Sequence, residues 1–429
     1  MGSTITLILL AATFVALVAF IIRGGNTLIG LFVLAIIWGI LGGLDFNGVR
    51  DNVIQDMSTY GSSIIIIAFG AWFGRVMMAT GIIDQIIKKT VELGGSFKLV
   101  TWILLTIVTH IIFMGSFGIG LVITIGLITI PVMVTLGIPK KAAVASLLMA
   151  VASGNYVTVT VYGMTTSLFP DVDYSAFFKV GLLAGGIQLV TTIIYEIINT
   201  RNKKIQFAWA VAAPEASQTE KPADKKIFFL AYLTPIVPVV LSALINWQAA
   251  PAFIVAILWA LVFSGNFLPL KKCQDLLLKT LQDGLSDIGL LTGLLLAITA
   301  FGRAASACAP LIGSFLQPII PTTPLIIAIA VGILAPLSLF RGPLNMMGVG
   351  AALGAILVQM GTFSNILCLF LIVVPTISMG ISACPTQSWN VWALSYAKLE
   401  PNDLLRSSVL WQWMACLIIM IAVSLFIGG

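Results

Sequence analysis

Apolar runs of about 20 residues, separated by short polar segments, recur along the whole chain. A run of this length can cross the hydrocarbon core of a bilayer as an α-helix. Seven runs precede a polar middle, at residues 4–22, 27–43, 61–82, 99–113, 118–138, 142–165 and 176–199. Seven more follow it, at residues 227–246, 250–266, 286–306, 323–340, 343–361, 364–384 and 405–428. The pattern predicts an all-α, polytopic transmembrane helix bundle in which some runs are re-entrant hairpins or broken helices.

Composition agrees with this fold class and excludes others. The chain of 429 residues is 59% hydrophobic and 9% charged, with a mean hydropathy of +1.09. Soluble domains carry about 25% charged residues, and a transmembrane barrel needs alternating segments of about ten residues rather than continuous runs. The first run has no basic flank or cleavage site, so we expect a span and not a removed signal. The five cysteines are scattered, which favours packing roles and predicts no metal site.

Charged residues alternate in sign from one loop to the next. The loops after runs 61–82, 118–138 and 176–199 are rich in lysine and arginine, whereas those after runs 27–43 and 142–165 carry aspartate. The positive-inside rule therefore places the N-terminus outside and the polar middle in the cytoplasm. The net charge of +6 is also a signal of topology, because the lysines and arginines cluster in particular loops.

The two halves of the chain repeat each other. Residues 71–75 (AWFGR) and 299–303 (TAFGR) are 303 − 75 = 228 apart, and the breaks at Gly115 and Gly342 are 342 − 115 = 227 apart. Because an odd number of runs precedes the second half, that half enters the membrane in the opposite orientation, and the repeat is inverted. The predicted units are an N-terminal transmembrane repeat, a cytoplasmic polar linker and a C-terminal inverted repeat, at residues 1–200, 201–226 and 227–429.

Two polar segments occupy the same place in each half, at residues 44–60 and 267–286. The second has apolar residues at helical spacing, so we expect both to be amphipathic helices that lie at the membrane interface. Their expected role is to anchor the protein or to support a homodimer.

Four places interrupt the apolar runs with glycine, proline or polar residues, at 114–120, 152–160, 341–345 and 382–390. Breaks at matching positions of two repeats are the best pointer in a sequence to a transport site, because half-helix ends present free backbone groups to a substrate. The alternative is that small and polar residues only let helices pack closely. The predicted substrate-binding residues are Ser116, Ser153, Asn155, Arg341, Asn345, Thr386, Gln387 and Ser388.

Three arginines and one histidine stand inside or beside the apolar runs. For Arg75 and Arg303 we expect a structural ion pair or a reach to the interface rather than contact with substrate, because a cation is costly in the membrane. Arg341 stands beside a break and could clamp an anion. His110, the single histidine, is expected to bond within the bundle, and the alternative is a protonation switch near the site. Carboxylates are nearly absent from the centres of the runs, and Glu196 and Asp287 lie near predicted ends, so a carboxylate proton relay is hard to place.

Residues 61–75 (GSSIIIIAFGAWFGR) and 80–84 (TGIID) resemble the third-helix region of gluconate permeases and citrate-transporter-like proteins. Residues 124–133 (TIGLITIPVM) and 136–139 (LGIP) are similar to the helix of those families that ends in a proline-containing stretch and an LG-x-P turn. The resemblance is to the ion transporter superfamily as a whole, and residues 153–156 (SGNY) replace its proline-rich hairpin. It implies an organic-anion symporter that holds its substrate between paired re-entrant hairpins.

Together these features predict a secondary active transporter, and not an enzyme, that moves a small carboxylate or sugar acid with H⁺ or Na⁺. No cofactor beyond the coupling ion, no metal and no nucleic acid are expected, and the expected location is the cell membrane of a prokaryote. One alternative is a cation/proton antiporter, which the scarcity of intramembrane carboxylates disfavours. Another is the large membrane subunit of a binding-protein-dependent carboxylate transporter, which would need partner subunits.

Overall fold

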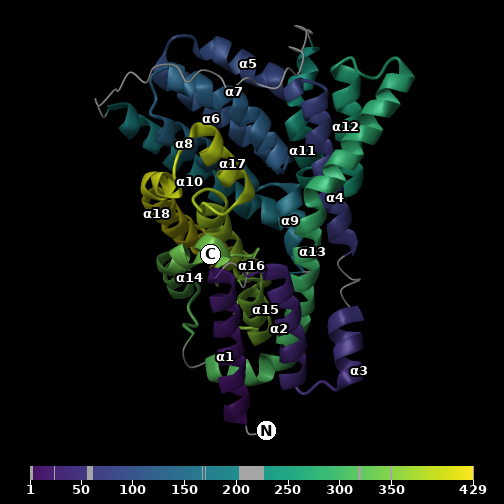
Figure 1. Ribbon diagram of the computed structural model, residues 1–429, viewed down its shortest axis with the longest axis vertical. Helices are drawn as coiled ribbons and strands as arrows, with labels where there is room; N and C mark the ends of the chain where they lie inside the picture. Colours follow the sequence, from purple (N-terminus) through teal and green to yellow (C-terminus); the bar gives the residue numbers. More distant parts are fainter. Residues whose placement is uncertain are drawn as a thin grey trace.

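In the part of the chain that the computed structural model describes, all regular structure is helical (Figure 1). The described residues are 3–23, 25–55, 61–166, 168–169, 171–201, 227–316, 320–347 and 350–428. The predicted fold class, an all-α polytopic helix bundle, is confirmed. The predicted linker lies outside the described residues apart from Arg201, so the boundaries of the two predicted repeats stay a prediction.

The first half contains α1 (Ser3–Ile22), α2 (Thr27–Leu41), α3 (Phe46–Val49), a π-helical turn η1 (Arg50–Ile54), α4 (Gly61–Ala79), α5 (Ile82–Gly94), α6 (Lys98–Gly115), α7 (Ile119–Thr135), α8 (Lys140–Asn155), α9 (Val159–Thr165) and α10 (Tyr174–Arg201). The second half contains a 3₁₀ segment η3 (Phe229–Ile236), α11 (Val237–Ala243), α12 (Ala249–Phe263), α13 (Leu270–Leu316), α14 (Pro324–Leu334), a second 3₁₀ segment η4 (Ala335–Arg341), α15 (Gly350–Met360), α16 (Asn365–Pro375), a π-helical stretch η5 (Thr376–Ile381), α17 (Ser388–Ala397) and α18 (Pro401–Gly428).

Fewer of these helices can cross a membrane than the fourteen apolar runs suggest. By length and composition, five described helical segments qualify as spans: α6, α10, α13, α14 with η4, and α18. Two bent pairs raise this to seven, because α4 turns by 61° into α5 and α8 turns by 67° into α9. Most of the other runs form apolar helices of 10–17 residues, as expected for re-entrant or broken elements. α1 is an apolar helix of 20 residues, which is long enough to cross a bilayer. Apolarity alone did not distinguish the shorter helices from full spans.

The segment 267–286 is helical from Leu270, as predicted, but it is continuous with the run that follows it, and its place at the membrane interface stays a prediction. This segment forms the first turns of α13, a helix of 47 residues and about 70 Å at 1.5 Å per residue. Gly284 lies within this segment and does not end the helix. It packs on α4, where a Cβ would lie 2.9 Å from the Trp72 backbone nitrogen. The matching segment at 44–60 does form the short helices α3 and η1, and its last residues, 56–60, lie outside the described residues.

The repeated FGR motif has the same packing role in both halves. Phe73 of α4 is fully buried and its ring lies 5.8 Å from that of Phe253 on α12. Phe301 of α13 is also fully buried, and its ring lies 4.9 Å from that of Trp38 on α2. Thus α2 packs on α13, α12 packs on α4, and α4 packs on α13. In Figure 1, α13 runs along one side of the molecule, with α4 and α12 beside its first part and α2 beside its second.

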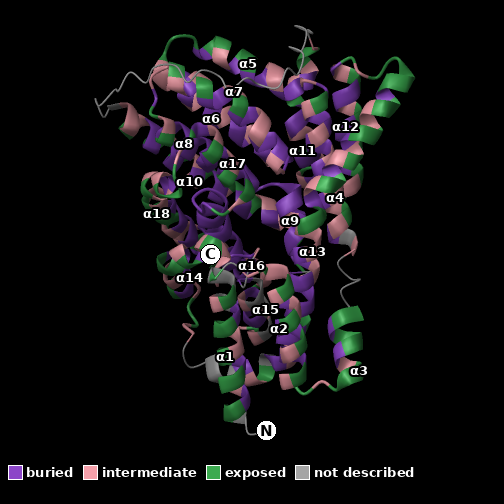
Figure 2. Ribbon diagram, viewed as in Figure 1, coloured by how far each residue is buried: buried purple, intermediate pink, exposed green. Residues whose placement is uncertain are grey.

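A second bundle of α6, α8, α10, α14, α16 and α18 lies beside this scaffold, whereas α15 packs on α13 and α1 packs on α2. α8 packs between α6 and α10, α18 packs on both α14 and α10, and α16 packs on α18. Every residue of α8 from Ala142 to Asn155 is buried, as is every residue of α16 from Leu367 to Pro375. Figure 2 shows this burial concentrated in the interior of the bundle, whereas α1 and α3 show exposed faces. Burial on every side shows that other helices surround α8 and α16, so these two helices form the core.

Candidate functional site

The first break separates α6 from α7 at Ser116, Phe117 and Gly118. Gly118 has φ 136°, which residues with a side chain rarely adopt, and it lets the chain reverse within three residues. A Cβ at Gly115 would overlap the carbonyl oxygen of Pro235, so η3 lies directly against the end of α6. Ser116 is fully buried, and its hydroxyl has no hydrogen-bond partner among the described residues.

The second break, between α8 and α9, lies against the first. The Thr158 hydroxyl donates to the carbonyl of Phe113 in the last turn of α6. Asn155 is fully buried; its Oδ1 accepts a long 3.4 Å bond from Thr158, and no described residue pairs with its Nδ2. An amide donor left without a partner in an apolar core costs about 1–3 kcal/mol, so Asn155 is a strong candidate to meet a ligand.

The prediction that His110 bonds within the bundle is confirmed. Its Nδ1 lies 2.8 Å from the hydroxyl of Ser153, and that hydroxyl also lies 2.7 Å from the carbonyl of Ala150. Two of the predicted residues, His110 and Ser153, are therefore neighbours, and Ser153 stands one turn or less before the break.

The third break follows η4. Leu339 is extended, and Phe340 and Arg341 have φ values of 54° and 59°, so the chain turns sharply at two residues that carry side chains. Gly342 follows them, and its backbone nitrogen donates to the carbonyl of Leu339 at 3.0 Å. Asn345 closes this turn: its Nδ2 donates to the carbonyl of Ser338 at 2.9 Å and its Oδ1 accepts from the backbone of Met347 at 2.9 Å. Both ends of its amide thus serve the backbone, which favours a structural role for this predicted ligand.

The fourth break, predicted at 382–390, follows η5 and leads into α17, and we take it together with η5 as the segment 376–390. Asn390 holds it together, because its Nδ2 donates to the carbonyls of Ile381 at 3.0 Å and Cys384 at 2.8 Å. The predicted residues here are the accessible ones: Thr386 and Ser388 are exposed and Gln387 is half-buried.

The segment 376–390 contacts the first break through aromatic rings. Phe117 lies between α6 and α7, and Trp389 lies in the first turn of α17. Their ring centroids are 5.5 Å apart and the rings meet edge to face.

The same segment joins the other two breaks by hydrogen bonds. The hydroxyls of Tyr156 and Ser378 lie 2.7 Å apart, which links it to the second break. The backbone of Phe340 donates to the sulfur of Cys384 at 3.1 Å, which links it to the third. The structure therefore brings the four predicted breaks together around the segment 376–390.

Sequence reasoning missed a buried amide pair beside this segment. Gln188 of α10 donates to the Oε1 of Gln412 of α18 at 2.7 Å, and the Ser378 hydroxyl lies 3.4 Å from the Oε1 of Gln188. The Gln412 Nε2 has no partner among the described residues. Two glutamines inside apolar helices were the signal, because an amide in a membrane core needs a polar neighbour.

Arg75 has the structural role that was predicted for it, whereas the role of Arg341 stays a prediction. Arg75 forms a two-bond ion pair with Asp287 of α13, at 2.6 Å from Nη2 and 2.7 Å from Nε, which confirms the expected structural pair. Arg303, its counterpart, is exposed. Arg341 is half-buried at the third break, and no carboxylate pairs with it in the described part of the chain.

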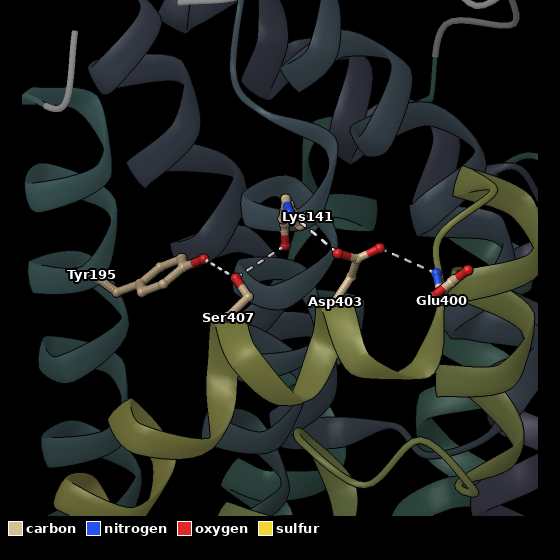
Figure 3. Close-up of polar contacts among 5 residues, drawn as sticks. All are labelled: Lys141, Tyr195, Glu400, Asp403 and Ser407. Atoms are coloured by element: carbon tan, nitrogen blue, oxygen red, sulfur yellow. Dashed lines mark hydrogen bonds and ion pairs between the residues drawn. The ribbon is translucent and has the colours of Figure 1, made fainter. Parts of the chain in front are cut away.

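Two further features do not include the predicted site residues, although Val159 of the second break lines the first of them. A cavity of about 840 Å³ opens between the start of α4, α9 and the loop between α11 and α12, lined among others by Tyr162, Tyr174 and Trp247. At the start of α18, Asp403 pairs with Lys141 of α8 at 3.2 Å, and Ser407 lies 2.6 Å from the hydroxyl of Tyr195 (Figure 3). None of the predicted site residues lines this cavity.

Solved structures of membrane transporters share this fold. The YdaH transporter of Alcanivorax borkumensis is 14% identical over 90% of this chain and 90% of its own, with a TM-score of 0.63. MtrF of Neisseria gonorrhoeae, which is described with a class of antimetabolite efflux pumps, is 14% identical over 92% of this chain and 93% of its own, with a TM-score of 0.54. No family model matches the chain, and no curated protein matches it. The resemblance to gluconate and citrate permeases is not confirmed, and the chain is a multi-pass membrane protein with the fold of these transporters.

Proposed function

We propose that this protein is a secondary active transporter of a small organic anion, a carboxylate or sugar acid, coupled to H⁺ or Na⁺. The observation that carries the proposal is that four helix breaks meet around the segment 376–390 and hold hydrogen-bond donors without a partner among the described residues. The Ser116 hydroxyl and the Asn155 Nδ2 are buried without partners among the described residues. Arg341 adds a cation that no described carboxylate neutralises.

These groups favour an anion over a cation or a neutral solute. An arginine binds a carboxylate with two parallel hydrogen bonds, and an amide nitrogen can donate to its remaining oxygens. The half-helix α7 begins beside Ser116, and the start of a helix carries a partial positive charge that adds to the same preference. A cation site would instead need carboxylates or free carbonyls, and Asn390 and Asn345 already occupy several of the carbonyls at these breaks.

The test is uptake into proteoliposomes of a panel of labelled carboxylates and sugar acids, under imposed pH or Na⁺ gradients. We expect at least one anion to accumulate under one gradient and not without it. If no member of the panel moves under either gradient, the proposed function is wrong.

Two variants test the site once a transported anion is known. Asn155→Ala and Arg341→Gln should each weaken apparent affinity by about 10- to 100-fold, the usual effect of losing a hydrogen bond to a charged group. Arg341→Lys should restore part of the affinity, because it keeps the charge and loses the paired geometry. Asn365→Ala is the matched control, because Asn365 bonds Asp171 on an exposed part of the chain. Wild-type affinity in both site variants would refute the assignment.

Export is the second candidate, because MtrF is described with efflux pumps. In that case the same site would release an organic anion outward in exchange for an entering proton. The sign of the imposed pH gradient distinguishes the two candidates, since a proton symporter accumulates the anion when the outer medium is the proton-rich side and an exchanger accumulates it when the outer medium is the proton-poor side.

A further inference from the structure

Glu196 is a buried acid that the candidate site does not use. It lies on α10, has no exposed surface, and its Oε1 accepts a hydrogen bond from the hydroxyl of Thr106 on α6. Its Oε2 has no hydrogen-bond partner in the described part of the chain. Sequence reasoning placed this residue near the end of its run and discounted it. Ionisable side chains buried inside membrane bundles are costly and usually functional, so this carboxyl requires an explanation.

No described cation pairs with Glu196. α6, α8, α9, α11, α16 and α18 pack against α10. The ionisable side chains of these elements and of α10 itself are Lys98, His110, Lys140, Lys141, Tyr162, Cys368, Asp403, Arg406, Cys416, Tyr174, Lys179, Tyr195 and Arg201. Thr106 is the one described residue that contacts the carboxyl by a hydrogen bond. A carboxylate here carries a charge that nothing described neutralises, and a proton on Oε2 neutralises it.

The surface lies close to this end of α10. Tyr195, the residue before Glu196, places its hydroxyl 2.6 Å from that of Ser407. Ser407 also bonds the backbone carbonyl of Lys141, and the Lys141 ammonium pairs with Asp403 (Figure 3). The side chain of Asp403 is 30% exposed. A polar cluster that reaches solvent therefore begins one residue from Glu196.

On its other side, Glu196 connects towards the helix breaks. Thr106 and His110 stand one turn apart on α6, and His110 bonds Ser153 just before the second break. A cavity of about 10 Å³, the space that one water needs, lies beside Thr106 and is lined also by Thr109, Thr129 and Ser146. Hydroxyl groups thus continue from the carboxyl towards the candidate site.

The geometry points to Glu196 as the proton-binding site that couples transport to a pH gradient. This inference rests on the proposed function and specifies H⁺ as its coupling ion. One proton from the side of the Asp403 cluster forms an O–H bond on Oε2 and turns the carboxylate into a carboxylic acid. In the opposite state of the transporter the same proton leaves, and no electron or other group is transferred. Thr106 is a positioning residue that holds the carboxyl through its other oxygen.

The first test uses only the proton as ligand. Infrared difference spectra of the reconstituted protein, recorded across a pH series in H₂O and D₂O, should show a carboxyl C=O band that appears and disappears with pH. Glu196→Gln should remove that band, whereas Glu92→Gln, an exposed control on α5 that pairs with Lys89, should keep it. Thr106→Val should move the midpoint of the titration and Thr106→Ser should restore it. A band unchanged in Glu196→Gln, or a midpoint indifferent to Thr106→Val, would overturn the inference.

The second test uses the anion that the wild-type protein transports. Glu196→Gln should still exchange labelled for unlabelled anion across the membrane, which shows that it folds and binds, but an imposed pH gradient should no longer drive accumulation. Full pH-driven accumulation in Glu196→Gln would overturn the inference. If wild-type protein moves no anion but shows the titrating band, the proposed function fails and the proton site stands. If transport is driven by Na⁺ alone and the band is absent, the proton site fails and anion transport stands.

Discussion

The breaks of the first half are closed, whereas the fourth break, in the second half, is open; Asn345 at the third break is buried. In the first half, Ser116, Ser153 and Asn155 have no exposed surface. In the second half, Thr386 and Ser388 are exposed. The predicted inverted repeat makes these breaks equivalent in connectivity, so connectivity does not explain the difference. In a transporter built from such repeats, one half closes over the site while the other opens, and we attribute the difference to such a state.

The breaks are held by two kinds of contact, close packing of glycines and hydrogen bonds of amides. A Cβ at Gly115 would overlap the Pro235 carbonyl oxygen, and a Cβ at Gly342 would overlap the Leu337 carbonyl oxygen, so neither position has room for a side chain. Asn345 and Asn390 fold the breaks of the second half by hydrogen bonds to backbone carbonyls. The glycine positions should tolerate substitution less well than the amides, because a clash with a backbone atom forces the backbone to move.

Gly115→Ala should have the largest effect on stability. The added methyl would overlap the Pro235 carbonyl oxygen, and because that oxygen is backbone, η3 or the end of α6 must move. We expect the free energy of unfolding to fall by about 3 kcal/mol or more, measured as a loss of thermal stability in detergent. Gly186→Ala on α10 is the control, because its Cβ would meet nothing within 4 Å. Equal stability of the two variants would show that the first break is not held by this contact.

The asparagines at the breaks give the next largest contrast. Asn390→Ala removes two hydrogen bonds to carbonyls and should cost about 1–3 kcal/mol of stability. Asn155→Ala removes an Nδ2 that no described residue accepts from, so its thermal stability should stay close to wild type while its transport changes. The measurement is a thermal melt of both variants beside their uptake. A reversed pattern would mean that Asn155 is structural and Asn390 contacts the substrate.

The sequence predicted the helices and the breaks better than their roles. Glycines, prolines and a polar, β-branched patch within the apolar runs located the breaks, because such residues interrupt a helix by local chemistry. The roles depended on tertiary contacts that no local pattern contains. Asn345, predicted to bind substrate, bonds the backbone with both ends of its amide, and Asp287, near the predicted end of its run, pairs with Arg75. Glu196 was discounted for its position in the sequence, although the packing of α6 on α10 buries it completely.

Cysteine accessibility tests the difference in openness directly. Thr386→Cys and Ser388→Cys should react with a water-soluble thiol reagent, whereas Ser116→Cys and Asn155→Cys should react at least about tenfold more slowly, because each must await an opening of the fold. The five native cysteines are buried and free, so the wild-type protein gives the background. Conditions that favour the opposite state should reverse the order. If all four cysteines react at one rate in every condition, the difference between the halves is not one of state.

The smallest effect is expected where the two halves meet at the surface. Lys141 of α8 and Asp403 of α18 form a pair 3.2 Å apart, and the lysine side chain is 59% exposed (Figure 3). Water and salt screen such a pair, and holding two mobile side chains together opposes its attraction. Lys141→Ala should therefore leave the melting temperature unchanged within error, both at low salt and at high salt. A clear loss of stability that high salt abolishes would show that this contact fastens α8 to α18. The closed first half would then be held by charge at its surface as well as by the backbone contact at Gly115.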